Sequence, residues 1–141
     1  MGTLVLGLAG TAIELLLLEH YDEPWQLVPL VLIALAFGVL AWHGARRTAA
    51  SLRALQITML LFVVSSGVGA ALHFRGAAEF QLEIDPAMPS STLIRKAMRA
   101  KDPPVLAPGV MLQLGLIGLV YAFACRLPWA AAQAPTVNHK E

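Results

Sequence analysis

Four long apolar stretches, separated by most of the charged residues, constrain this sequence more than any other feature. They cover residues 2–19, 27–43, 53–73 and 105–126. A helix that crosses a hydrocarbon core about 30 Å thick needs about 20 apolar residues, and each stretch reaches or approaches that length. Backbone polar groups inside a bilayer must be satisfied within the segment itself, which favours helices. The sequence therefore predicts an all-α integral membrane protein, a four-transmembrane-helix bundle.

The overall composition agrees with a location in the lipid bilayer. Of the 141 residues, 57% are hydrophobic and 13% are charged, whereas soluble domains usually have about 25% charged residues. A single membrane domain is expected over residues 1–129, followed by a disordered tail over residues 130–141. The net charge of +1 gives no reason to expect a nucleic-acid partner.

One long loop, residues 74–104, has a pattern of its own. Residues 79–84 alternate polar and apolar side chains, which is typical of a short strand. Residues 90–101 place apolar and basic side chains on opposite arcs, which predicts a short amphipathic helix on the membrane surface. Loop residues expected to contact a partner or the membrane surface are Phe80, Leu82, Ile84, Leu93, Arg95, Lys96 and Arg99.

The distribution of basic residues predicts the orientation. An even number of spans puts both termini on the same side of the membrane. Arg46, Arg47, Arg53 and Arg126 lie close to span ends on that side, whereas the loop over residues 19–26 has no basic residue. Because short cytoplasmic loops are enriched in Lys and Arg, the termini are expected in the cytoplasm, with the protein in a bacterial inner membrane.

Glu14 is an ionisable residue inside the first apolar stretch. Such residues usually face the bundle interior, a cavity or a partner. Counting along the helices puts Glu14, Ser66 and Gln113 at similar depths, so they are predicted to form an intramembrane polar layer. Two roles stay open: a protonated carboxyl that fixes the register of the helices, or a proton or cation relay.

A second group of polar residues lies at the ends of the first and third spans. Imidazole nitrogen and carboxylate oxygen suit divalent transition metals, although such residues are also common wherever a span meets water. His20 and His73 could alternatively bind a b-type haem between the two helices. The candidate metal ligands are Glu19, His20, Asp22, His73 and Glu79.

Four short spans with a glutamate in the first resemble the small multidrug resistance transporters. That resemblance implies that Glu14 would be a shared site for protons and drugs. It covers topology and Glu14 alone, because the loop over residues 74–104 is much longer than the family's loops. The chain is not assigned to that family.

No known catalytic motif occurs, so a non-enzymatic role is expected. Four helices enclose few buried polar groups, and a homo-oligomer or a larger membrane complex is therefore predicted. The expected function is a small membrane subunit or accessory protein whose outer rim binds a partner or a divalent cation. The alternatives are a proton-coupled transporter that uses Glu14 and a haem electron carrier that uses His20 and His73.

Overall fold

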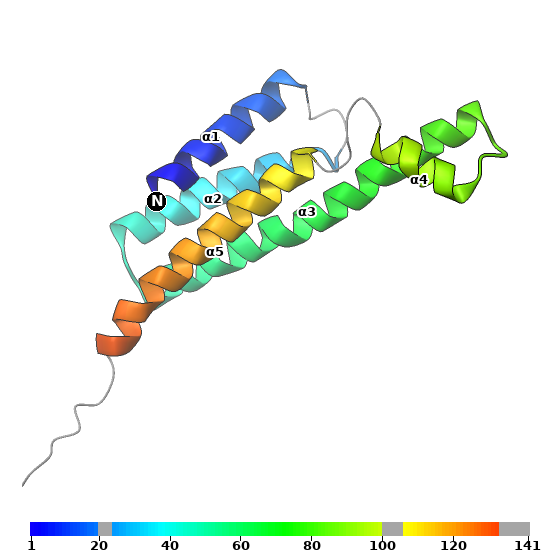
Figure 1. The fold of residues 1–141 in the computed structure, drawn as a ribbon. Coiled ribbons are helices and arrows are strands. Elements are labelled where there is room, and N and C mark those ends of the chain that lie inside the picture. Colours follow the sequence, from blue (N-terminus) through cyan, green and yellow to red (C-terminus); the bar gives the residue numbers. More distant parts are fainter. Residues whose placement is uncertain (20–23, 100–105, 133–141) are drawn as a thin grey trace, which may run out of the picture.

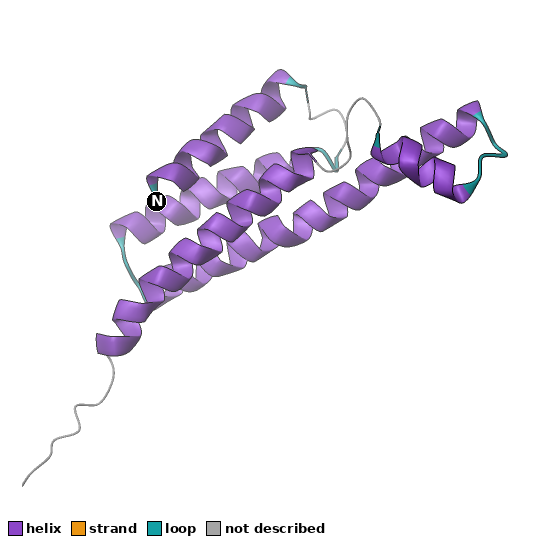
Figure 2. Ribbon diagram, in the orientation of Figure 1, coloured by secondary structure: helices purple, strands orange, loops and turns teal. Residues whose placement is uncertain are grey.

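Five helices make up the regular structure of the described residues. The computed structural model describes residues 1–19, 24–99 and 106–132. All five run in one elongated body, with a hairpin at one end (Figure 1), and the described residues contain no strand (Figure 2). The helices are α1 (Gly2–Leu17), α2 (Leu27–Ala45), α3 (Ala49–Ile84), α4 (Ser90–Met98) and α5 (Leu106–Ala132).

The strand predicted over residues 79–84 is wrong, because these residues continue α3. The helix has 36 residues and runs about 54 Å at 1.5 Å per residue. No glycine or proline interrupts residues 77–84, and an isolated strand there would have no neighbour to pair with. Asp85 ends the helix in an extended conformation, as expected for a residue before proline, and its carboxylate accepts a hydrogen bond from Ala87 N–H at 3.2 Å.

The predicted number of spans is also wrong. Among the described residues, three helices are long and apolar enough to cross a membrane, namely α2, α3 and the Pro108–Cys125 part of α5. The first helix has only 16 residues, about 24 Å, because the chain turns at Glu19 with a φ of 51°. A membrane location follows from the three long helices, and α1 is a shorter apolar helix beside them.

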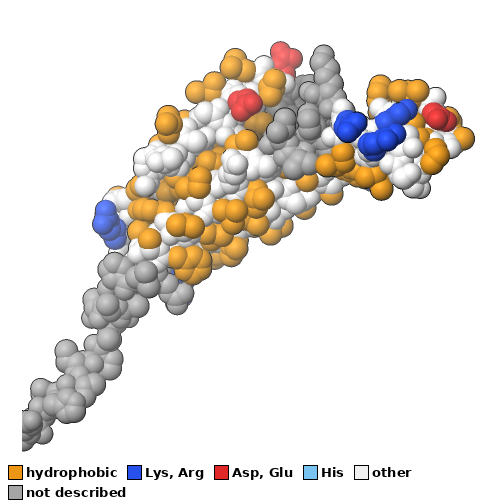
Figure 3. All heavy atoms as spheres, in the orientation of Figure 1, with side chains coloured by type: hydrophobic (Ala, Val, Ile, Leu, Met, Phe, Trp, Pro, Cys, Tyr) orange, Lys and Arg blue, Asp and Glu red, His pale blue; other side chains and the backbone are white. Residues whose placement is uncertain are grey.

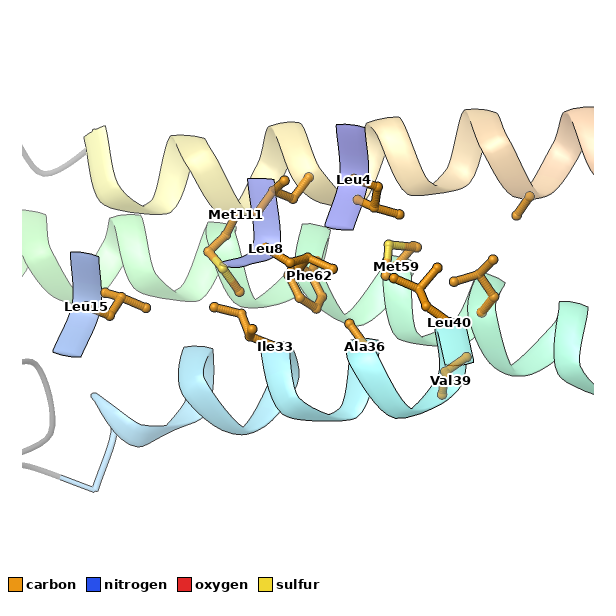
Figure 4. Close-up of a cluster of buried hydrophobic side chains, with 13 residues drawn as sticks. Leu4, Leu8, Leu15, Ile33, Ala36, Val39, Leu40, Met59, Phe62 and Met111 are labelled. Atoms are coloured by element: carbon orange, nitrogen blue, oxygen red, sulfur yellow. The ribbon is translucent and has the colours of Figure 1, made fainter. Parts of the chain in front are cut away.

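Close contact between α3 and α5 forms the centre of the bundle. Gly115 and Gly118 of α5 face α3, where a Cβ on Gly115 would lie 2.9 Å from the Met59 carbonyl oxygen. Helices approach this closely only where a side chain is missing. Apolar side chains of α1 and α2 pack against those of α3 and α5 to complete the core. Figure 4 labels Leu4, Leu8 and Leu15 of α1, Ile33, Ala36, Val39 and Leu40 of α2, Met59 and Phe62 of α3, and Met111 of α5.

A buried histidine, His43, stabilises the short turn between α2 and α3. The Ser51 hydroxyl donates to the Arg46 carbonyl at 2.8 Å, so the 2.9 Å contact with His43 is a hydrogen bond that Nδ1–H donates to Ser51 Oγ. Thr48 and Ser51 also cap α3 reciprocally through their side chains and backbone N–H groups. The His43 ring meets the Tyr121 ring edge-on, with centroids 6.3 Å apart. The Ser51 side chain therefore connects His43 of α2, the Arg46 carbonyl in the turn and the first turn of α3.

Replacing Ser51 by alanine is expected to lower the free energy of unfolding by about 2 kcal/mol. The change removes a helix cap and leaves the buried His43 N–H without its acceptor. Thermal unfolding in mild detergent measures this effect. Ser65→Ala is the matched control, because Ser65 lies in the same helix and none of the hydrogen bonds between described residues involves its side chain. Equal midpoints for the two variants would contradict the prediction.

Candidate interaction surface

The most distinctive feature of the molecule is the hairpin that α3 and α4 form beyond the bundle (Figure 1). The apolar part of α3 ends near Leu72, and His73, Arg75, Glu79 and Glu83 follow within the same helix. Twelve residues, 73–84, rise about 18 Å further. Because these charges do not suit a hydrocarbon environment, this part of α3 stands outside the membrane.

Small side chains allow α4 to pack closely against the outer end of α3. Ala97 of α4 is fully buried and Leu93 is half-buried. Half-buried Phe74, Ala77 and Gln81 recur at helical spacing on α3. The amphipathic helix predicted for this region exists, but part of its apolar arc is covered by α3 rather than left for the membrane surface.

The hairpin tip exposes apolar side chains. Phe80 is 59% exposed, Ile84 is 65% exposed and Leu82 is also exposed, all in the last turns of α3. Near them lie Ser90 and Ser91, the exposed first residues of α4. Apolar groups that are rimmed by polar residues and stand in water are typical of protein contact sites. We refer to Phe80, Leu82 and Ile84 as the hairpin tip.

The hairpin base is basic. Arg95, Lys96 and Arg99 are exposed on α4, beside the exposed apolar Ile94 and Met98. Figure 3 shows Lys and Arg side chains gathered on the visible face of the hairpin. Among the described residues, none of the three basic side chains takes part in a salt bridge, whereas Arg75 pairs with Glu79 at 2.7 Å. The basic face is thus exposed and not neutralised by any described carboxylate.

The predicted polar layer does not assemble inside the single chain. Ser66 is buried in the bundle, but Glu14 and Gln113 are exposed on α1 and α5. The buried face of α1 consists of Leu4, Leu8, Thr11 and Leu15, about a quarter turn from Glu14. The sequence placed these residues at similar depths, but it did not identify the face of each helix that turns inward.

The predicted rim metal site is only partly within the described residues. His20 and Asp22 lie outside them, and Glu19 and His73 are exposed. Glu79 is engaged with Arg75. In the part of the chain that the structure describes, no three His, Cys, Asp or Glu side chains come together as metal ligands would. The metal site and the haem site on His20 and His73 stay predictions.

Sequence reasoning missed two features of this surface. It treated residues 79–84 as a strand, so it did not recognise the hairpin, although the Asp85–Pro86 stop signal and the following helix were readable. It also gave no indication that His43 is buried, whereas His43 is 4% exposed. The Thr48-x-x-Ser51 spacing is the signal that could have shown a capped helix next to that histidine.

Comparisons with known protein families, with characterised proteins and with solved structures found no match to this chain.

Proposed function

We propose that this chain is a small non-enzymatic membrane subunit or accessory protein whose hairpin tip binds a partner protein outside the membrane. The supporting observation is α3, which continues about 18 Å past its apolar part and carries exposed apolar residues at its end. More than half of the surface of Phe80 and of Ile84 is exposed to solvent. Apolar anchors of this kind supply most of the binding energy in protein interfaces.

We further propose that the hairpin faces the outer side of a bacterial inner membrane, with the termini in the cytoplasm. Arg46, Arg47 and Arg53 are exposed at the α2–α3 end of the bundle, opposite the hairpin. Clustered arginines next to span ends favour the cytoplasmic side. The partner would then be periplasmic or would carry a periplasmic domain.

Two other functions from the sequence receive less support. A proton path through one chain needs Glu14 in the interior, and Glu14 is exposed on the bundle surface. A divalent cation on the rim would compete with Arg75 for Glu79. The exposed tip needs no rearrangement to meet a protein, and for that reason partner binding is the function we favour.

A photo-crosslinker at the tip tests the proposal. With p-benzoylphenylalanine in place of Glu83, we expect one discrete adduct with a different protein in native membranes. Phe80→Asp combined with Ile84→Asp should lower its yield at least tenfold, because each lost anchor costs about 2 kcal/mol. Ser91→Asp is the control, since it adds charge near the tip without removing an apolar side chain. An absent adduct, or one that the double variant leaves unchanged, would contradict partner binding.

A further inference from the structure

The outer face of α1 is a second surface without a partner in the single chain. Exposed Leu6, Gly10, Ile13 and Leu17 recur at intervals of three and four residues along it, and Leu6 and Leu17 are 74% and 78% exposed. This spacing is typical of a helix face that packs against another helix. Glu14 lies beside this face, and ionisable residues at membrane depth usually face protein rather than lipid.

The C-terminal end of α1 is acidic, whereas the hairpin base is basic. Exposed Glu14 and Glu19 lie in and just after the last turn of α1. Neither forms a salt bridge with another described residue, as is also the case for Arg95, Lys96 and Arg99. Figure 3 shows acidic side chains on α1 and basic side chains on α4 toward the same end of the molecule. The described residues therefore include an acidic surface and a basic surface that form no salt bridge with one another.

Packing within the bundle sets the relative heights of the two surfaces. Gly7 of α1 faces Leu114 of α5, and Gly69 of α3 faces Pro108 of α5, so counting along the helices puts Glu14 about level with Gly69. Glu19, just past the end of α1, then lies at most about 7 Å higher. Counting back from the hairpin turn puts Arg99 about level with Arg75, about 9 Å above Gly69. Glu19 and Arg99 thus differ in height by less than one helical turn, and Arg95, four residues nearer the tip, lies about 6 Å further out.

In the part of the chain that the structure describes, the two surfaces lie on helices that pack against different neighbours. Helix α1 packs on α2 and α5, α4 packs on α3, and in Figure 1 α1 and α3 run along opposite sides of the bundle. Rotation about an axis normal to the membrane keeps every height unchanged. A neighbouring copy related in this way can bring its hairpin base level with the acidic end of α1. Such a head-to-tail contact uses two different surfaces of the chain and can close into a ring.

We infer that the chain self-associates in the membrane, with the acidic outer face of α1 docked on the α3–α4 side of a second copy, Glu19 facing Arg95 and Arg99. Complementary charge sets the register of the contact, and the apolar residues of α1 pack against the neighbouring bundle. The contact uses the hairpin base and leaves Phe80 and Ile84 free. It is therefore independent of the partner proposed for the tip.

Charge reversal on each surface tests this contact in the full-length protein, purified into phosphatidylcholine nanodiscs or mild detergent. The wild type should form an oligomer of defined mass. Glu19→Lys alone, and Arg95→Glu with Arg99→Glu, should each weaken association at least tenfold, because attraction becomes repulsion. An equimolar mixture of the two variants should restore the oligomer, since the basic α1 end of one then meets the acidic hairpin base of the other.

The mixture keeps the test informative, because two variants that merely misfolded would not rescue each other. Glu83→Lys is the control, with the same charge change elsewhere on the hairpin, and it should leave the mass unchanged. The inference would be overturned if the wild type were monomeric, if neither charge reversal weakened the oligomer, or if the mixture of the two variants stayed dissociated. It would also be overturned by association that needs anionic phosphatidylglycerol, which would assign the basic face to lipid headgroups. None of these results bears on the tip crosslink.

Discussion

Replacing Gly115 by valine is expected to prevent α5 from packing on α3 and to leave little stable protein. A Cβ at this position would lie 2.9 Å from the Met59 carbonyl oxygen, 3.0 Å from Val63 Cγ2 and 3.1 Å from Phe62 Cβ. The first of these atoms belongs to the backbone of α3, so no side-chain rotation relieves the overlap. The two helices must move apart along the most extensive contact of the bundle.

The expected loss is about 3 kcal/mol, which is a large part of the 5–15 kcal/mol that stabilises an ordinary domain. Thermal unfolding of the purified protein in detergent, read by circular dichroism, measures it. Gly109→Val is the matched control, since a Cβ on Gly109 of the same helix meets nothing within 4 Å. If both variants unfolded at the same temperature, the α3–α5 packing described above would be wrong.

The predicted fold of four spans with a strand was wrong, but the sequence did predict three membrane-length helices, because one physical requirement dominates them. A long apolar segment in lipid must satisfy its own backbone, so the helices α2, α3 and α5 follow from length and composition. The same reasoning overestimated the length of the first helix. Its apolar run continues through Leu18, but the helix ends at Leu17 and Glu19 has a positive φ, and apolar character alone does not indicate such an end.

The hairpin could not be found from periodicity alone. Residues 79–84 alternate as a strand would, yet local sequence period does not decide between helix and strand over six residues. Residues 79–84 are helical because α3 already includes the residues before them and no proline interrupts it before Pro86. The apolar part of α3 and the helix itself end at different residues. The charged residues that follow Leu72 end the apolar part, whereas the extended backbone at Asp85 ends the helix.

The orientation of Glu14 was unpredictable for a different reason. Leucines and other apolar residues surround α1 on every side, so the pattern does not mark one face as the interior. Gly7 does contact α5, as its small size suggested. Glu14 lies on the same side, but α1 packs through Leu4, Leu8 and Leu15, and the carboxyl stays at the surface.

Replacing Ala97 by glutamate is expected to release α4 from α3. Ala97 is fully buried between the two helices, and an unpaired carboxylate in that position costs several kcal/mol. Because α4 has only nine residues, it depends on this packing to stay helical. The released segment should therefore become a substrate for trypsin after Arg95, Lys96 and Arg99.

Cleavage of a transiently opened segment follows its opening free energy when reclosing is fast. A loss of about 3 kcal/mol then raises the cleavage rate on the order of a hundredfold. Mass spectrometry of timed digests measures the fragments from α4, and Met98→Glu serves as control, because it adds the same charge at an exposed neighbour. Equal rates would mean that α4 does not rest on Ala97. A faster rate in Ala97→Glu alone would show that packing on α3 holds the basic hairpin base in position, and the self-association inferred above requires that position.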